Sequence, residues 1–319
     1  MSLNSIEICA GAGGQALGLE QAGFEHVSLV EIEAAACQTL RFNRDHWHVT
    51  EGDLRHYSAE KWRGIDLLAG GVPCQPFSQA GKQHGNEDER DLFPEAIRLV
   101  SECQPQAVML ENVRGLLDSV FDEYRAKIIA DLKKLGYVAE WRLLNASDFG
   151  VPQLRPRVVL VALKRNIAEY FVWPSAFIAP LPTVGEALFD LITANGWRGA
   201  VPWREKACDI APTLVGGSKK HGGPDLGPTR AKKAWASIGV DGMGIADAAP
   251  EQDFIGMPRL TVRMAARIQG FPDHWQISGK KTPAYRQIGN AFPPPVARAV
   301  GTQIQTALNA AAKPKLKRA

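Results

Sequence analysis

The stretch Ile6-Glu7-Ile8-Cys9-Ala10-Gly11-Ala12-Gly13-Gly14-Gln15-Ala16-Leu17-Gly18 decides the fold class of this chain of 319 residues. Its apolar start predicts a buried strand, its glycines predict a tight turn, and residues 15–20 predict the start of a helix. Glycine lets the backbone approach a ligand at a helix N-terminus, so this unit favours a nucleotide-type cradle. Glycine-rich turns are common, however, and the spacing differs from Gly-x-Gly-x-x-Gly, which argues against a nicotinamide cofactor.

Apolar runs that alternate with helical patterns continue through the first half of the chain and predict an α/β fold. Expected strands lie at residues 27–30, 65–69, 106–110, 138–144 and 158–163, with a third unit at 52–54. Expected helices lie at residues 33–43, from Pro94 onward, at 124–135, within 259–270 and at 296–311. Between residues 166 and 257 proline and glycine are frequent and periodicity is poor, so a smaller, irregular domain is expected there.

The segment Gly70-Gly71-Val72-Pro73-Cys74-Gln75-Pro76-Phe77-Ser78 follows the expected strand at 65–69. Glycine and proline end the strand, and the cysteine stands where an α/β sheet presents residues to its ligand crevice. Cys74 is therefore a candidate nucleophile, although a buried structural cysteine would give the same local pattern. The polar loop at 79–91 is long and charged enough for a mobile lid, with a plain surface loop as the alternative.

Charged residues also stand at the ends of other expected strands. Glu31 could accept hydrogen bonds from a ribose diol or could cap the helix that follows, and Asp53 could lie near an adenine amino group. Glu111 follows another strand in the same way. Arg155 and Arg157 face one side before the last expected strand, either as a clamp for an anion or a carbonyl or as a surface pair.

The composition limits the classes of function. No run of 18 apolar residues exists and the N-terminus lacks signal-peptide features, so a cytoplasmic location without membrane contact is expected. The five cysteines form no Cys-x-x-Cys pair and no ligand pattern joins the histidines, so reduced thiols and no metal are expected. Residues 198–233 carry eight Lys/Arg against three acids, hence 8 − 3 = +5, whereas residues 234–258 carry −4. This basic, glycine-rich segment suits phosphate contact, and a solvated loop is the alternative.

Six short blocks together resemble the DNA cytosine-5 methyltransferase family, in the order that the family shows. The blocks are residues 10–14, 73–78, 111–113, 153–157, 259–261 with 269–272, and 287–291. The resemblance covers nearly the whole chain outside the middle segment. It implies an α/β fold with a Rossmann-like, S-adenosylmethionine-dependent methyltransferase sheet and a smaller, irregular target-recognition domain. It places the catalytic domain at residues 1–165 plus 283–319 and the recognition domain at 166–282.

The family's chemistry implies roles for four residues. The Cys74 thiolate would add to C6 of a cytosine, so that C5 can attack the methyl group of S-adenosylmethionine. Glu111 would hold the base by its N3 and amino edge, and should be at least partly protonated in the complex. Arg157, with Arg155 beside it, would bind the O2 carbonyl and offset charge on the ring. The sequence does not identify the base that removes the C5 proton.

The resemblance also implies binding residues. Those around the cofactor would be Ala10, Gly11, Ala12, Gly13, Gly14, Glu31, Ile32, Asp53, Leu54, Pro73, Leu92, Asn290 and Ala291. Gly11, Gly13 and Gly14 would approach its methionine part, Glu31 its ribose and Ile32 its adenine. The target base would be flipped out of the duplex, near DNA contacts from Gln75, Ser78, Arg90, Thr213, Lys219, Lys220 and Arg230. The implied enzyme is a monomeric DNA (cytosine-5-)-methyltransferase of a bacterial restriction-modification system, nucleoid-associated through double-stranded DNA, with its restriction endonuclease acting separately.

Three positions depart from the family pattern. Cys9 stands where Phe is usual, Met264 where Glu is usual and Phe292 where a small aliphatic residue is usual.

Two rival functions stay open. A transfer-RNA cytosine-5 methyltransferase shares the Pro-Cys-Gln core, although the long basic middle segment favours DNA. A non-catalytic DNA-binding relative is the other rival, against which the intact Cys74, Glu111 and Arg157 argue. The target sequence cannot be read from side chains alone. Residues 216–220 loosely resemble a region of some restriction-modification enzymes, and this resemblance implies a GC-rich palindrome.

Overall fold

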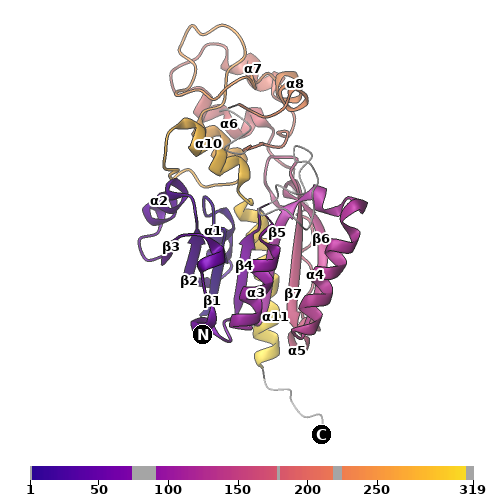
Figure 1. Cartoon of the computed structure of the whole chain (residues 1–319). Helices are drawn as coiled ribbons and strands as arrows, with labels where there is room; N and C mark the ends of the chain where they lie inside the picture. Colours follow the sequence, from indigo (N-terminus) through magenta and orange to yellow (C-terminus); the bar gives the residue numbers. More distant parts are fainter. Residues whose placement is uncertain (1, 74–90, 178–179, 218–224, 314–319) are drawn as a thin grey trace.

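The computed structural model describes residues 2–73, 91–177, 180–217 and 225–313, and these contain one seven-stranded sheet (Figure 1). The strands are β1 (Leu3–Ile8), β2 (Phe24–Glu31), β3 (Val49–Glu51), β4 (Leu67–Gly71), β5 (Ala107–Val113), β6 (Tyr137–Asn145) and β7 (Pro156–Lys164). Their order is β3-β2-β1-β4-β5-β7-β6, with β7 antiparallel to both neighbours and all other pairs parallel. The predicted α/β class is confirmed. The third unit was misplaced: the strand is Val49–Glu51, and residues 52–54 follow it.

The strand order reverses at β1, and this reversal determines where a ligand can bind. From β1 the chain proceeds to β2 and β3 on one side and then crosses to β4 and β5 on the other. Ile8 pairs with Gly70 in the parallel ladder, so the loops after β1 and β4 leave the sheet side by side. Open α/β sheets bind ligands at such a reversal, outside the carboxyl ends of the strands.

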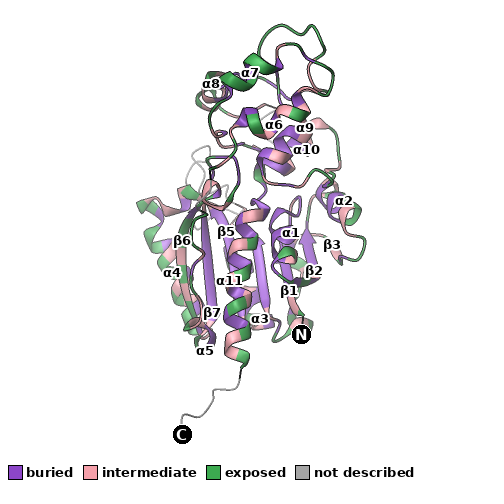
Figure 2. Ribbon diagram, turned by 180° about the vertical axis from the view of Figure 1, so that it is seen from behind, coloured by how far each residue is buried: buried purple, intermediate pink, exposed green. Residues whose placement is uncertain are grey.

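Helices cover both faces of the sheet (Figures 1 and 2). The α-helices are α1 (Gly14–Gln21), α2 (Ala34–Asn43), α3 (Phe93–Cys103), α4 (Asp122–Lys134), α5 (Arg165–Ala168), α6 (Val184–Ile192), α7 (Ala200–Lys206), α8 (Thr229–Ser237), α9 (Val262–Ile268), α10 (Lys281–Asn290) and α11 (Pro294–Ala312). Short 3-10 helices are η1 (Leu54–His56), η2 (Glu60–Trp62), η5 (Arg114–Leu117), η6 (Ser119–Phe121) and η7 (Ala146–Phe149). None of the helices in these parts of the chain has the length and apolar character that a membrane span requires.

Alternate residues of the central strands enter different cores. Leu67 and Ala69 of β4 pack in the core beneath α1 and α11, whereas Leu68 packs in the core beneath α3 and α4. Burial on both faces explains why these strands are apolar without alternation. α11 lies directly against α1. The contact is so close at Gly18 that a Cβ there would lie only 2.3 Å from the carbonyl oxygen of Pro294.

A smaller helical unit, made mainly of α6 to α10, lies beyond the carboxyl ends of the strands (Figure 1). The described part of residues 166–282 contains short helices and long connections but no strand, with isolated bridges from Gln153 to Ala211 and from Ala246 to Thr261. The expectation of irregular structure therefore holds for the connections, and it missed the short helices.

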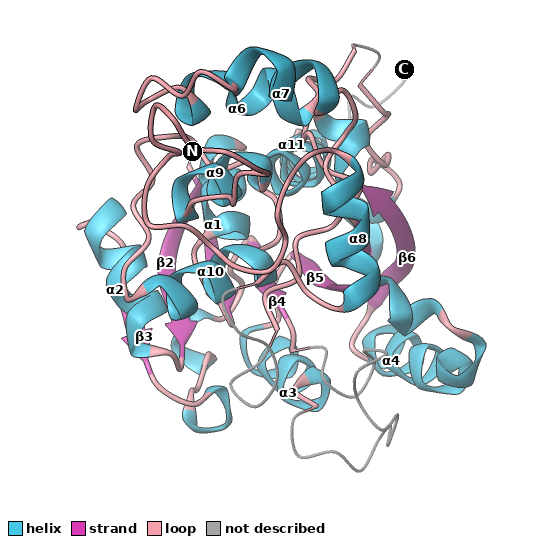
Figure 3. Cartoon of the chain, turned by 90° about the horizontal axis from the view of Figure 1, so that it is seen from above, coloured by secondary structure: helices cyan, strands magenta, loops and turns pink. Residues whose placement is uncertain are grey.

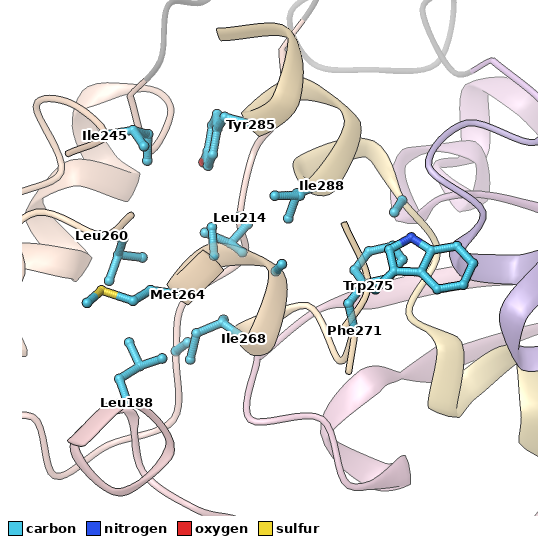
Figure 4. Close-up of a cluster of buried hydrophobic side chains, with 14 of the residues drawn as sticks. Leu188, Leu214, Ile245, Leu260, Met264, Ile268, Phe271, Trp275, Tyr285 and Ile288 are labelled. Atoms are coloured by element: carbon cyan, nitrogen blue, oxygen red, sulfur yellow. The ribbon is translucent and has the colours of Figure 1, made fainter. Parts of the chain in front are cut away.

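The two units share one hydrophobic core (Figure 4). Leu188, Met264 and Trp275 belong to the cluster in the smaller unit, and the same cluster continues to Ala12 and Leu40 around the glycine-rich loop. The smaller unit is therefore anchored to the sheet by packed side chains. The predicted domain boundaries at 165/166 and 282/283 stay predictions.

Candidate active site

Glu111 and Arg157 form a buried ion pair at the carboxyl edge of the sheet. β5 carries Glu111, and the antiparallel β7 brings Arg157 opposite Val113. Arg157 Nε lies 2.8 Å from Glu111 Oε1, and only 11% and 9% of the two side chains are exposed. Burial raises the pKa of Glu111 above its ordinary value, and the positive charges of Arg157 and Arg155 oppose this rise. A raised pKa brings the carboxyl closer to the range in which it can donate a proton at neutral pH.

The end of β4 lies beside this pair. Gly71 is paired with Glu111 in the parallel ladder, and a Cβ on Gly71 would lie 3.4 Å from Glu111 Oε2. Asn112 Nδ2 donates a hydrogen bond to the carbonyl oxygen of Val72 at 3.1 Å, which fixes the turn after β4. The chain therefore leaves β4 next to the Glu111 carboxyl, three residues before Cys74.

Several predicted residues lie outside the described parts of the chain. They are the candidate nucleophile Cys74 and the predicted DNA contacts Gln75, Ser78, Arg90, Lys219 and Lys220. The roles given to them stay predictions.

Arg155 binds the protein backbone. Its side chain is fully buried, and Nη1 donates to the carbonyl oxygen of Leu214 at 2.8 Å. Nη2 donates to the carbonyl oxygens of Gly289 at 2.7 Å and Ala291 at 3.0 Å. Arg157 therefore reaches Glu111, whereas Arg155 joins β7 to the segment around Leu214 and to the end of α10. The predicted contact of Arg155 with the base stays a prediction.

Two fully buried glutamines extend the contacts of Arg155. Gln153 Nε2 donates to the carbonyl oxygen of Ile268 at 3.1 Å and to Gln269 Oε1 at 2.9 Å. The backbone N–H of Leu214 donates to Gln153 Oε1 at 2.9 Å, and Gln269 Nε2 donates to the carbonyl oxygen of Ala291. Sequence reasoning placed both glutamines in family blocks without a role, and that membership was the signal that could have found them. We call Gln153, Arg155 and Gln269 the buried polar network.

The glycine-rich loop after β1 is held from two sides. Gly11 N donates to Glu31 Oε2 at 2.7 Å, and Trp275 Nε1 donates to the carbonyl oxygen of Ala12 at 3.0 Å. Gly11 has a φ of +53°, and a Cβ there would meet no atom within 4 Å, so the loop is open on that side. Trp275 had no predicted role, although it fixes this loop from a segment assigned to the recognition domain.

Gly13 and Gly14 are required by packing inside the protein. A Cβ on Gly13, where φ is +80°, would lie 2.7 Å from Leu40 Cδ2. A Cβ on Gly14 would lie 2.3 Å from the carbonyl oxygen of Phe292. Neighbouring side chains and backbone therefore account for these two glycines, and their contact with the cofactor stays a prediction.

Both carboxylate oxygens of Glu31 accept hydrogen bonds from the backbone, and the predicted contact of Glu31 with a ribose stays a prediction. Oε1 accepts a hydrogen bond from Glu33 N at 2.7 Å at the start of α2, while Oε2 accepts from the glycine-rich loop. Burial raises the pKa of this carboxyl, and the backbone N–H donors oppose the rise. Next to it, the apolar side chain of Ile32 is 60% exposed at the same edge of the sheet.

These residues fit S-adenosylmethionine. A carboxyl at the end of the second strand can accept hydrogen bonds from a ribose diol. The exposed Ile32 offers an apolar surface for a flat ring, and the open side of Gly11 leaves room for close approach of a ligand.

Other predicted cofactor residues have different surroundings. The carboxylate of Asp53 accepts from the N and Nη1 of Arg55 at 3.0 Å each, and Leu54 is buried in the core. Leu92 is partly buried before α3. Asn290 is exposed, and its Nδ2 donates to the carbonyl oxygen of Gly217 at 3.2 Å. The Asn290 side chain is therefore bonded to the connection before α8, and its predicted contact with the cofactor stays a prediction.

Two predicted DNA contacts are described. The hydroxyl of Thr213 donates to the carbonyl oxygen of Leu154, which fixes Thr213 to the segment before β7. Arg230 is exposed on the first turn of α8. This helix lies beside α7 in the part of the smaller unit remote from the sheet (Figure 1), and the view from above projects it over the strands (Figure 3).

The three departures from the family pattern have local explanations or consequences. Cys9 takes a left-handed φ of +51°, and burial raises the pKa of its thiol. Met264 is buried, and its backbone N–H donates to Oγ1 of Thr261, the N-cap residue of α9, at 3.2 Å. Phe292 is buried in the core beside α11.

Comparisons with known proteins agree with this geometry. The family model of the C-5 cytosine-specific DNA methylases matches residues 3–306. The chain is 60% identical over 311 residues to Type II methyltransferase M.NgoMIV of Neisseria gonorrhoeae, covering 97% of this chain and 99% of that protein. It is 59% identical over 314 residues to Type II methyltransferase M.NaeI of Lentzea aerocolonigenes, covering 97% and 76%. A solved structure of a prophage-encoded DNA modification methyltransferase from E. coli is similar with a TM-score of 0.69 and 25% identity, covering 97% of this chain and 100% of that one. The chain therefore belongs to the family of C-5 cytosine-specific DNA methylases.

Proposed function

We propose that this enzyme transfers a methyl group from S-adenosylmethionine to C5 of a flipped-out cytosine in a short duplex DNA sequence, through a covalent bond between Cys74 and C6. The observation that carries the proposal is the buried Glu111–Arg157 pair beside the end of β4. An acid whose pKa burial raises and a cation next to it are the two groups that a cytosine needs on its N3 and O2 edge.

The chain's residues act in a defined order. The Cys74 thiolate adds to C6, and Glu111 donates a proton to N3 as electrons move into the ring. Arg157 holds O2 and keeps Glu111 in position. As C5 takes the methyl group, the N3 proton returns to Glu111. A base then removes the C5 proton, and the electron pair of the C5–H bond forms the C5=C6 double bond and expels the Cys74 thiolate from C6.

S-adenosylmethionine supplies an electrophilic methyl group on a sulfonium when it is bound. Glu31 would accept hydrogen bonds from its ribose, Ile32 would cover the adenine, and the loop at Gly11 would approach the methionine part. Asp53, Asn290 and Ala291 would complete the pocket.

Duplex DNA would lie between the carboxyl edge of the sheet and the smaller unit. The exposed Arg230 on α8 would contact phosphates, together with Lys219 and Lys220. The relatives M.NgoMIV and M.NaeI are Type II methyltransferases, which supports a role as the modification enzyme of a restriction-modification system. We expect a monomer that works in the cytoplasm and whose restriction endonuclease acts separately.

Labelled methyl transfer tests the substrate. Purified protein is incubated with tritiated S-adenosylmethionine and either duplex DNA or transfer RNA, with Cys74→Ser as the inactive control. Label in DNA alone supports the proposal, and label in transfer RNA with none in DNA contradicts it. Bisulfite sequencing of DNA from a host that expresses the protein then gives the target sequence.

A further inference from the structure

The smaller unit, here called the recognition unit, reaches the Glu111–Arg157 pair through residues 211–217, here called the recognition segment. Residues 211–217 run beside residues 152–155, with Ala211 N donating to the carbonyl oxygen of Pro152 at 3.1 Å and Leu154 N donating to that of Ala211 at 2.8 Å. Leu214 then bonds to both Gln153 and Arg155 through its backbone N–H and carbonyl oxygen. Two residues after Arg155, Arg157 binds Glu111. The path from the recognition segment to the ion pair is therefore continuous and short.

The same segment is pressed against the end of α10. A Cβ on Gly216 would lie 2.4 Å from Asn290 Oδ1 and 2.7 Å from the carbonyl oxygen of Arg286. A Cβ on Gly289 would lie 2.4 Å from Gly216 N. Glycine is needed on both sides of this contact, and no side chain can enter between the two backbones.

The buried polar network holds these pieces in one arrangement. Arg155 bonds to carbonyl oxygens on the recognition segment and on the end of α10, and Gln269 bonds to Ala291 beside them. Gln153 adds the end of α9 through Ile268. A guanidinium and two amides without any exposed surface are costly unless each finds hydrogen-bond partners, so a displaced recognition segment would leave several buried groups unsatisfied.

We propose that Gln153, Arg155 and Gln269 are positioning residues that couple engagement of DNA by the recognition unit to the placement of Arg157 against Glu111. The coupling rests on the proposed methyl transfer to DNA. The network touches neither the base nor the cofactor in this scheme. It acts on the rate of the reaction by fixing where Arg157 stands, since small misplacements of a catalytic group slow a reaction strongly.

The test compares Arg155→Lys and Gln269→Leu with the wild type. Arg155→Lys keeps the charge but has a single ammonium in place of the fork that spans three carbonyl oxygens. Gln269→Leu keeps the approximate volume and removes the bond to Ala291. Arg142→Lys is the matched control, because Arg142 lies on the outer edge strand β6 and pairs with Glu140.

Single-turnover methyl transfer is measured at saturating DNA, alongside the dissociation constants for DNA and S-adenosylmethionine and the thermal midpoint. Both network variants should transfer methyl roughly 10- to 100-fold more slowly, while both dissociation constants stay within about threefold of the wild type. The control should match the wild type in all measurements. The loss should be larger on the DNA sequence that the wild type modifies than on single-base variants of it, so that discrimination falls.

Two results overturn the coupling. One is a wild-type transfer rate in both variants at saturating DNA, with or without weaker DNA binding, because the network would then only hold the recognition unit in place. The other is a loss of rate that is fully explained by a lower thermal midpoint. If Arg155→Lys does not fold, Gln269→Leu decides alone. A wild type that methylates no DNA refutes the proposed function instead, so the two failures are distinguishable.

Discussion

Replacing Arg157 with methionine removes the guanidinium from the buried pair and keeps much of the aliphatic volume. Arg157 Nε lies 2.8 Å from Glu111 Oε1, and both side chains are nearly inaccessible to water. Two unit charges about 4 Å apart attract by about 4 kcal/mol at an effective dielectric constant of 20, and the desolvation of both groups offsets part of this. We therefore expect a loss of about 2 to 4 kcal/mol of transition-state stabilisation, which slows methyl transfer roughly 30- to 900-fold.

The pH dependence gives an independent readout of the same change. Without Arg157, the largest opposing charge is gone and burial raises the pKa of Glu111 further. The limb of the pH–rate profile that reports Glu111 should therefore move to higher pH in Arg157→Met. The assay is single-turnover transfer of labelled methyl to duplex DNA between about pH 5.5 and 9, with Arg142→Met as a control on the outer strand. A rate within about threefold of the wild type and an unmoved limb would refute a catalytic role for the pair.

Three further predictions concern stability and the cofactor loop. Burial raises the pKa of Glu7, so the folded state keeps a proton that the unfolded chain loses above pH 4.5, and the wild type loses stability as the pH rises. In urea titrations, Glu7→Gln should therefore increase the free energy of unfolding by more than about 1 kcal/mol at pH 8 and change it little near pH 4. Burial lowers the pKa of His26 to about 4, so the stability that its neutral ring provides is complete above pH 6.5 and is lost as the pH falls from 6.5 to 4. If the free energy of unfolding of His26→Gln and of the wild type depended on pH in the same way, this prediction would be contradicted. Trp275→Phe removes the bond to Ala12 that holds the glycine-rich loop, and calorimetry should show affinity for S-adenosylmethionine weakened about 3- to 10-fold, whereas unchanged affinity would mean that packing alone fixes the loop.

The sequence predicted the sheet, and it marked residues that the structure brings together at the carboxyl edge, because both depend on local patterns. Continuous apolar runs marked the buried strands, and an acid or arginine at a strand end marked Glu111 and Arg157. The short strand Val49–Glu51 was missed because three mostly exposed residues carry no apolar run. Its position depends on pairing with β2, which only the folded structure reveals.

Side chains whose partners lie far away in the chain could not be assigned from the sequence. Arg155 looked equivalent to Arg157 from its spacing, but its guanidinium bonds to Leu214 and Gly289. Asn290 likewise bonds to Gly217, 73 residues away. Family blocks marked these positions as important, and tertiary contacts decided what each side chain binds.

The covalent bond between Cys74 and cytosine is the central claim and has a direct test. Duplex DNA that carries 5-fluorocytosine at the mapped target site is incubated with the enzyme and S-adenosylmethionine, and the denatured complex is digested and mapped by mass spectrometry. Fluorine cannot leave C5 as a proton does, so the account predicts a denaturation-resistant complex in which methylated base is joined to Cys74, absent in Cys74→Ala. Active enzyme that forms no such complex, or forms it through another residue, would contradict the account.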